Sequence, residues 1–111
     1  MNDDRKLHIF ESGSGEDWFL AYDEEDAIVL NAEMIGETEA REEGMSQIPD
    51  AKVFVMSFRE EDVPQALRDH AEARVTPLEK MEGDGWTHRV WAPAWVWAEC
   101  QPRGFLASTN Y

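Results

Sequence analysis

The sequence of 111 residues has a single cysteine, Cys100, and few basic residues. One cysteine excludes an intramolecular disulfide and leaves no cysteine-rich zinc site, so the fold must depend on its hydrophobic core. The 10 Lys and Arg residues stand against 24 Asp and Glu, which gives a formal net charge of −14. Binding to DNA, RNA or anionic lipid needs Lys and Arg to neutralise phosphates, so this balance argues against direct contact with nucleic acid or membrane.

Long apolar runs are also missing. No segment approaches the roughly 20 apolar residues that span a bilayer, and the N-terminus lacks the basic and then apolar order of a signal peptide. We therefore expect a single acidic domain, residues 1–111, in the cytoplasm of a bacterial host cell. Leu, Ile, Val and Phe supply only 22 residues, but five Trp and five Met add apolar surface that favours a folded chain.

The motifs of common enzyme classes are absent as well. The sequence has no phosphate-binding loop, no dinucleotide fingerprint and no His-Glu-x-x-His. Cys100 could pair with His8, His70 or His88 for nucleophilic catalysis, but nothing in the spacing supports this, and a lone cysteine is more often a small buried hydrophobe. The histidines could also gather around a metal, and the acidic runs could bind calcium, although they lack the alternating ligands of a calcium loop. We predict a protein that is not an enzyme and has no cofactor or metal.

The negative charge is concentrated in the first half of the chain. Residues 1–50 hold 15 acidic and 3 basic residues, a net charge of −12, whereas residues 51–111 hold 9 and 7, a net charge of −2. From Gly85 on the chain is nearly neutral and contains four of the five Trp. We therefore expect one strongly negative region of the surface and a neutral, aromatic end.

The first half of the chain predicts a hairpin followed by a helix. Aromatic and aliphatic residues in 6–10 and 17–22 flank a Ser-Gly-Ser-Gly turn, the pattern of two antiparallel strands. Asp23 can cap a helix that has acids in its positive first turn, and Gly36 can end it. Residues 36–49 have no apolar stripe and are expected to form a loop or a marginal helix.

The second half predicts a strand, a helix and two more strands. Residues 52–58 place apolar side chains on both faces, which is typical of a central strand covered on both sides. A helix is expected from Asp62 to Arg74, followed by a short helical turn over 76–79. Strands are expected over 86–91 and 94–100. The resulting fold class is α+β, a two-layer sandwich in which two helices cover one face of a mixed four- or five-stranded sheet.

The aromatic end has two possible uses. Trp95 and Trp97 would share one face of the last strand, which makes them candidates for the core. Any Trp left exposed there would be an anchor for a protein partner, because interface hot spots are enriched in Trp.

The acidic surface admits three explanations: solubility, an acidic patch that meets a basic partner, and mimicry of DNA. Mimicry has a physical basis, since carboxylates at i, i+3 and i+4 of a helix lie roughly 5–6 Å apart, comparable to phosphates along a strand. A groove lined by Lys and Arg would accept such a surface in place of nucleic acid, with fast, salt-sensitive association. The candidate partner-binding residues are Glu16, Asp17, Glu24, Glu25, Asp26, Glu33, Glu37, Glu39, Glu42 and Glu43.

Two segments, Trp18–Ala27 and Gly104–Tyr111, resemble stretches of small proteins of bacteriophages and mobile elements. With its size and charge, the chain is similar in kind to anti-CRISPR proteins, several of which are small, acidic and block the DNA-binding surface of an interference complex. That class shares no common motif, so no functional residue is carried over. The resemblance implies stoichiometric inhibition by occupation of a site that recognises nucleic acid.

Three functional hypotheses follow. The leading one is a non-enzymatic inhibitor that binds the basic surface of a nucleic-acid-binding protein or CRISPR effector complex through an acidic, DNA-mimicking face. The alternative is a small regulatory or adaptor domain that binds a protein through its aromatic C-terminal end or through the sheet edge, with the acids serving solubility. The third is an enzyme of unrecognised type that uses His88, Glu99 and Cys100.

Overall fold

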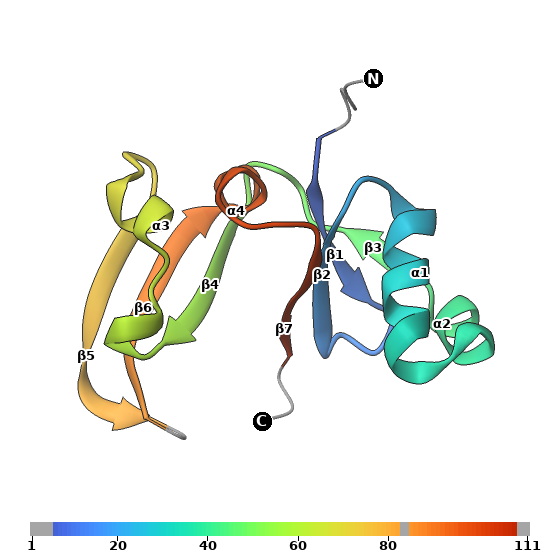
Figure 1. Cartoon of the computed structure of the whole chain (residues 1–111), viewed down its shortest axis with the longest axis horizontal. Helices are drawn as coiled ribbons and strands as arrows, with labels where there is room; N and C mark the ends of the chain where they lie inside the picture. The colour runs from blue at the N-terminus through green and yellow to red at the C-terminus, as the bar shows by residue number, and fades with distance from the viewer. Residues whose placement is uncertain (1–5, 83–84, 109–111) are drawn as a thin grey trace.

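The computed structural model describes residues 6–82 and 85–108 (Figure 1). A β-hairpin and two helices come first, and five further strands are interspersed with short helices thereafter. In chain order the elements are β1 (His8–Ser12), β2 (Asp17–Ala21), α1 (Glu24–Ile35), α2 (Glu37–Glu43), β3 (Met45–Gln47), β4 (Val53–Phe58), the 3₁₀ helix η1 (Glu60–Asp62), α3 (Gln65–Asp69), β5 (Arg74–Glu82), β6 (Trp86–Pro93), α4 (Ala94–Cys100) and β7 (Gly104–Ser108). None of the helices in these residues is long and apolar enough to cross a bilayer.

The strands form two antiparallel sheets, one in the order β3-β1-β2-β7 and the other in the order β4-β6-β5. The α+β class and the sandwich of helices against sheet are confirmed. The strands are divided between two sheets, however, and every pairing among residues 6–82 and 85–108 is antiparallel, so the sheets are not mixed. Hairpin connections explain the antiparallel pairing of β1 with β2 and of β5 with β6, because parallel neighbours need a long crossover.

The hairpin and the first helix form as the sequence predicts. The β1–β2 ladder pairs Phe10 with Phe19, and the Asp26 backbone N–H donates to Asp23 Oδ1 at 2.8 Å, which caps α1. Gly36 ends the helix with a φ of 94°, in the region that favours glycine. Ala27 is fully buried with these Phe side chains in a core cluster beneath α1.

A second core cluster joins the two sheets around α4. Ile9 and Leu20 of the first sheet lie in one buried cluster with Val90 of the second and with Trp97 of α4. Trp97 is fully buried, and its Nε1–H donates to the Phe54 carbonyl at 2.9 Å and to the Ala92 carbonyl at 3.1 Å. This helix therefore forms the junction of the fold (Figure 1).

The strand predicted over 94–100 is wrong, because these residues form α4. Pro93, with a φ of −58°, directly precedes the first turn, and proline is compatible with a helix start. Residues two apart point to nearly opposite sides of a helix, so Trp95 and Trp97 do not share a face. Trp97 is buried, whereas Trp95 is 37% exposed.

Two predictions for the middle of the chain are also wrong. The helix expected over 62–74 is reduced to η1 and the short α3, and the helical turn expected over 76–79 lies in strand β5. Pro77 is tolerated in β5 because this strand is at the edge of its sheet. Strand β4 forms as predicted. It lies at the edge of its sheet, however, and not at the centre, so Val53 and Val55 are exposed.

The segment expected to be a loop or marginal helix is more regular than predicted. It forms α2 and the short strand β3, which pairs with β1. Ala40 is fully buried and supplies the apolar contact of α2.

Candidate functional site

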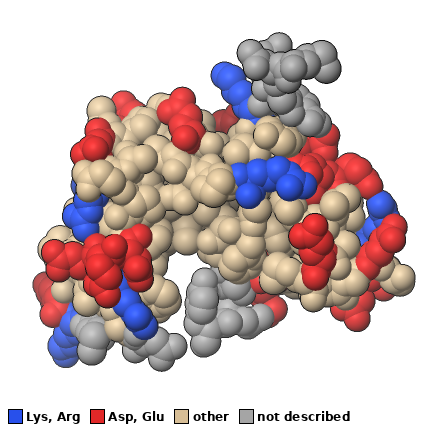
Figure 2. Space-filling model, viewed as in Figure 1, with Lys and Arg blue, Asp and Glu red and all other residues tan. Residues whose placement is uncertain are grey.

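The acidic charge predicted for the first half is concentrated on the two helices α1 and α2. Residues 23–43 hold nine acidic residues and one basic residue, Arg41. Both helices lie at one end of the molecule, beside the four-stranded sheet (Figure 1). Carboxylates gather at this end and also at the opposite end of the molecule, and the middle of the face shown is largely uncharged (Figure 2). We name the surface of α1 and α2 the acidic helical layer.

Arg41 forms ion pairs that bridge the two helices of the acidic helical layer. Its two terminal nitrogens donate to the two carboxylate oxygens of Glu25, at 2.7 and 3.1 Å, and its Nε donates to Glu37 at 3.2 Å. Hydrogen bonding from Arg41 holds the pKa of Glu25 below its usual value, and the two carboxylates raise the pKa of Arg41. A fork-shaped Arg–carboxylate pair fixes geometry as well as charge.

Asp26 is also engaged within the protein. Its carboxylate accepts hydrogen bonds from Arg103 Nε–H at 2.9 and 3.1 Å and from the Tyr22 backbone N–H at 3.0 Å. The pairing with Asp26 raises the pKa of Arg103. Asp26 therefore ties the start of α1 to the segment that leads into β7.

The ten predicted partner-binding acids differ in what they can offer a partner. Glu25, Asp26 and Glu37 are engaged in ion pairs. Asp17 and Glu43 are half-buried, and Glu43 Oε1 is buried without a hydrogen-bond partner in the described part of the chain. The remaining members are exposed: Glu16 on the β1–β2 turn, and Glu24, Glu33, Glu39 and Glu42 on the helices. Glu39 and Glu42 are three residues apart on α2, the spacing that places two carboxylates on one side of a helix.

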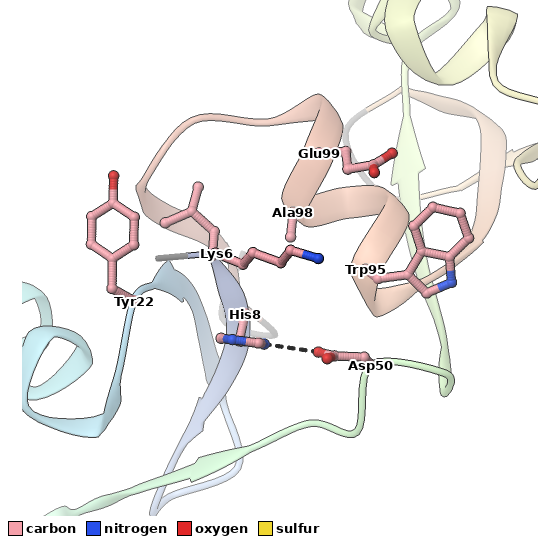
Figure 3. Close-up of a pocket in the computed structure, with 8 residues that line it drawn as sticks. Lys6, His8, Tyr22, Asp50, Trp95, Ala98 and Glu99 are labelled. Atoms are coloured by element: carbon pink, nitrogen blue, oxygen red, sulfur yellow. Dashed lines mark hydrogen bonds and ion pairs between the residues drawn. The ribbon is translucent and has the colours of Figure 1, made fainter. Parts of the chain in front are cut away.

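A cleft of about 490 Å³ lies between the start of β1 and α4 (Figure 3). Its lining comes from four separate parts of the chain: Lys6, Leu7, His8, Tyr22, Asp50, Trp95, Ala98 and Glu99. His8 Nδ1 lies 2.9 Å from Asp50 Oδ1, and the side chain of Lys6 extends toward α4. The lining combines both signs of charge with aromatic rings.

Trp95 forms one wall of this cleft. His70 packs edge-on against its ring at a centroid distance of 5.4 Å, and His70 Nε2 lies 3.3 Å from Glu99 Oε2. No sequence pattern indicates this cleft, because its lining residues are separated by up to 93 positions, from Lys6 to Glu99. No local spacing signals such an assembly.

The catalytic and metal-binding groups considered from the sequence are dispersed. His88 Nδ1 lies 2.8 Å from Thr87 Oγ1 on β6, whereas His70 neighbours Glu99. Burial, with a further contribution from Glu99, raises the pKa of the Cys100 thiol, which opposes formation of a nucleophilic thiolate. Within residues 6–82 and 85–108, no three His, Cys, Asp or Glu side chains gather as a metal site.

Comparison with known proteins found no matching family model, curated protein or solved structure.

Proposed function

We propose that this chain is a non-enzymatic inhibitor whose acidic helical layer binds the basic surface of a nucleic-acid-recognising protein and blocks access of DNA. Its site of action would be the cytoplasm of a bacterial host cell, with a CRISPR effector complex as the target class. The observation that carries the proposal is the net charge of −8 over residues 23–43, on two helices joined by Arg41.

Ion pairs within the acidic helical layer support recognition over mere solubility. Solubility requires only charge, whereas recognition benefits from carboxylates held in fixed positions before binding. Arg41 links α1 to α2, and the bond from Arg103 to Asp26 links α1 to the sheet. These ion pairs leave Glu24, Glu39 and Glu42 exposed on a braced support.

Charge also supports the choice of target class. A surface with many carboxylates attracts a Lys- and Arg-lined groove over distances of about 8–10 Å at moderate salt, and this steering raises association rates. Nucleic-acid-binding surfaces are much more positively charged than protein–protein interfaces. The resemblance to anti-CRISPR proteins points to the same target class.

The test is capture from nuclease-treated lysates of bacteria that express CRISPR effector complexes. The tagged protein should retain a nucleic-acid-binding assembly, and added duplex DNA should release it because both ligands compete for one groove. The captured assembly should also elute between roughly 0.05 and 0.5 M salt. Capture that resists both DNA and salt would contradict the proposal.

The adaptor hypothesis is the second candidate, and exposed Trp95 favours it. This ring is 37% exposed at the wall of the cleft, where a partner side chain could pack against it. An interface of this kind would persist in high salt and would be lost in Trp95→Ala. The two candidates are therefore separated by the salt dependence of capture.

A further inference from the structure

The four sheet edges in the described part of the chain differ in how they are protected. Edge strands usually carry charges or proline, or are very short, because these features prevent pairing with other chains. Strand β3 has only three residues, and β5 contains Pro77 and three charged residues among its first seven. The other two edge strands, β4 and β7, have no charged residue and no proline.

The open edge of β4 presents the backbone groups of alternate residues. Val53 stands opposite Pro93, and the Ala94 N–H donates to the Lys52 carbonyl at 2.8 Å. Because hydrogen-bonded and non-hydrogen-bonded pairs alternate in an antiparallel ladder, Val53 belongs to a non-hydrogen-bonded pair. The N–H and C=O groups of Val53, Val55 and Ser57 therefore point away from β6, toward the open edge.

The two neutral edges meet at one hollow. A pocket of about 200 Å³ lies between β4 and the segment that enters β7. Strands β4 and β7 run in the same direction (Figure 1). The lining of the pocket is mainly apolar and includes Met56 and Phe58 of β4 and Phe105 and Leu106 of β7. Phe105 remains 48% exposed, and the Val53 and Val55 side chains are 53% and 37% exposed on β4.

We infer that the β4 edge binds an extended segment of another protein, which adds a strand to the three-stranded sheet. Backbone groups of the segment would pair with Val53, Val55 and Ser57, and its apolar side chains would enter the hollow beside β7. Two copies of this chain would each bring a charge of −14, so long-range repulsion opposes self-pairing. The occupant is therefore a neutral, apolar strand with basic flanking residues.

This inference is independent of the acidic helical layer. The probe is a display library of short random peptides, selected on the full chain in roughly 0.5 M salt to suppress charge-driven capture. Selected peptides should be apolar at alternate positions, and the bound peptide should slow amide hydrogen exchange at Val53, Val55 and Ser57. Methylation of the peptide nitrogens that face β4 should weaken binding at least about tenfold, because it removes those donors.

Protein variants complete the test. Val55→Pro removes an outward N–H while leaving the ladder to β6, and Val55→Lys places a charge on the edge; each should weaken peptide binding about tenfold or more. Val29→Lys, which changes an exposed valine of α1, is the matched control and should bind as the unmodified chain does. Glu24→Gln/Glu39→Gln/Glu42→Gln should also bind normally, which separates this inference from the proposed function.

Three results would overturn the inference. One is that no peptide is enriched, and a second is that the methylated peptide binds as well as its parent. The third is that both Val55 variants, shown to be folded by their amide spectra, retain full affinity. Self-association through β4, detected as a dimer that Val55→Lys dissociates, would instead identify a second copy as the occupant and contradict the assignment to another protein.

Discussion

Arg103 Nε–H donates to both carboxylate oxygens of Asp26, a residue 77 positions earlier in the chain. The pair joins the first turn of α1 to the segment that leads into β7. The Asp26 side chain is 17% exposed, so this ion pair is partly shielded from water. Because of this shielding, the pair contributes more to the free energy of unfolding than a typical surface ion pair does.

Asp26→Asn should lower the free energy of unfolding by about 1–2 kcal/mol, because it removes a charge-assisted bond but keeps the side-chain shape. Urea denaturation measures the change. Glu33→Gln, an exposed acid on the same helix, is the control and should change stability by less than about 0.5 kcal/mol. Equal effects of the two substitutions would contradict a structural role for Asp26.

Glu25→Gln should alter the pH dependence of stability. Arg41 lowers the pKa of Glu25 from its ordinary value of 4.5, so the stabilisation from this pair is complete above that pH and is lost as the pH falls through the lower folded value. The difference in Tm between the unmodified chain and Glu25→Gln should therefore shrink on acidification below pH 4.5. Glu24→Gln is the control for the loss of one negative charge. A difference in Tm between the unmodified chain and Glu25→Gln that widens at low pH would refute the role given to Arg41.

The two tryptophans of α4 should respond differently to substitution. Trp97→Phe should cost about 2–4 kcal/mol, because it leaves space in the core and removes the Nε1–H donor. Trp95→Phe should cost less than about 0.5 kcal/mol, since this ring is partly exposed. Thermal and urea unfolding measure both changes, and comparable losses would mean that Trp95 belongs to the core.

Gly13→Ala should destabilise the contact between the β1–β2 turn and the end of α2. A Cβ at Gly13 would lie 1.9 Å from the Glu43 carbonyl oxygen, so the backbone must move, at a cost of about 3 kcal/mol. Gly15→Ala meets no atom within 4 Å and is opposed only by its positive φ, which should cost about 1 kcal/mol. A larger loss at Gly15 would contradict the packing described for Gly13.

Local signals explain why the first part of the fold could be predicted. The turn before Asp17, the cap at Asp23 and the stop at Gly36 each act within a few residues, and each forms as expected. The prediction of a strand over residues 94–100 was wrong because alternating Trp and Val are compatible with both a strand and a helix. The segment's choice of helix depends on burial of Trp97 between two sheets, which is a tertiary effect.

The candidate sites also divide into features that local sequence signals predict and features that depend on tertiary packing. Acidic runs identified the helical end of the molecule directly, because neighbouring acids on one helix remain neighbours in space. Three other features each join segments that are distant in the sequence. They are the ion pair of Asp26 with Arg103, the cleft beside Trp95, and the adjacent edges of β4 and β7. These features depend on how the two sheets pack, which no local pattern encodes.

Competition between this protein and DNA for a captured effector complex tests the central claim most directly. The measurement is the concentration that halves target-DNA binding, for the unmodified chain, for Glu24→Gln/Glu39→Gln/Glu42→Gln and for a control with the same charge change, Glu61→Gln/Glu72→Gln/Glu79→Gln. We predict that the helical variant is weaker by about tenfold or more, while the control remains close to the unmodified chain. Equal potency of all three proteins, or equal loss in both variants, would contradict recognition through the acidic helical layer.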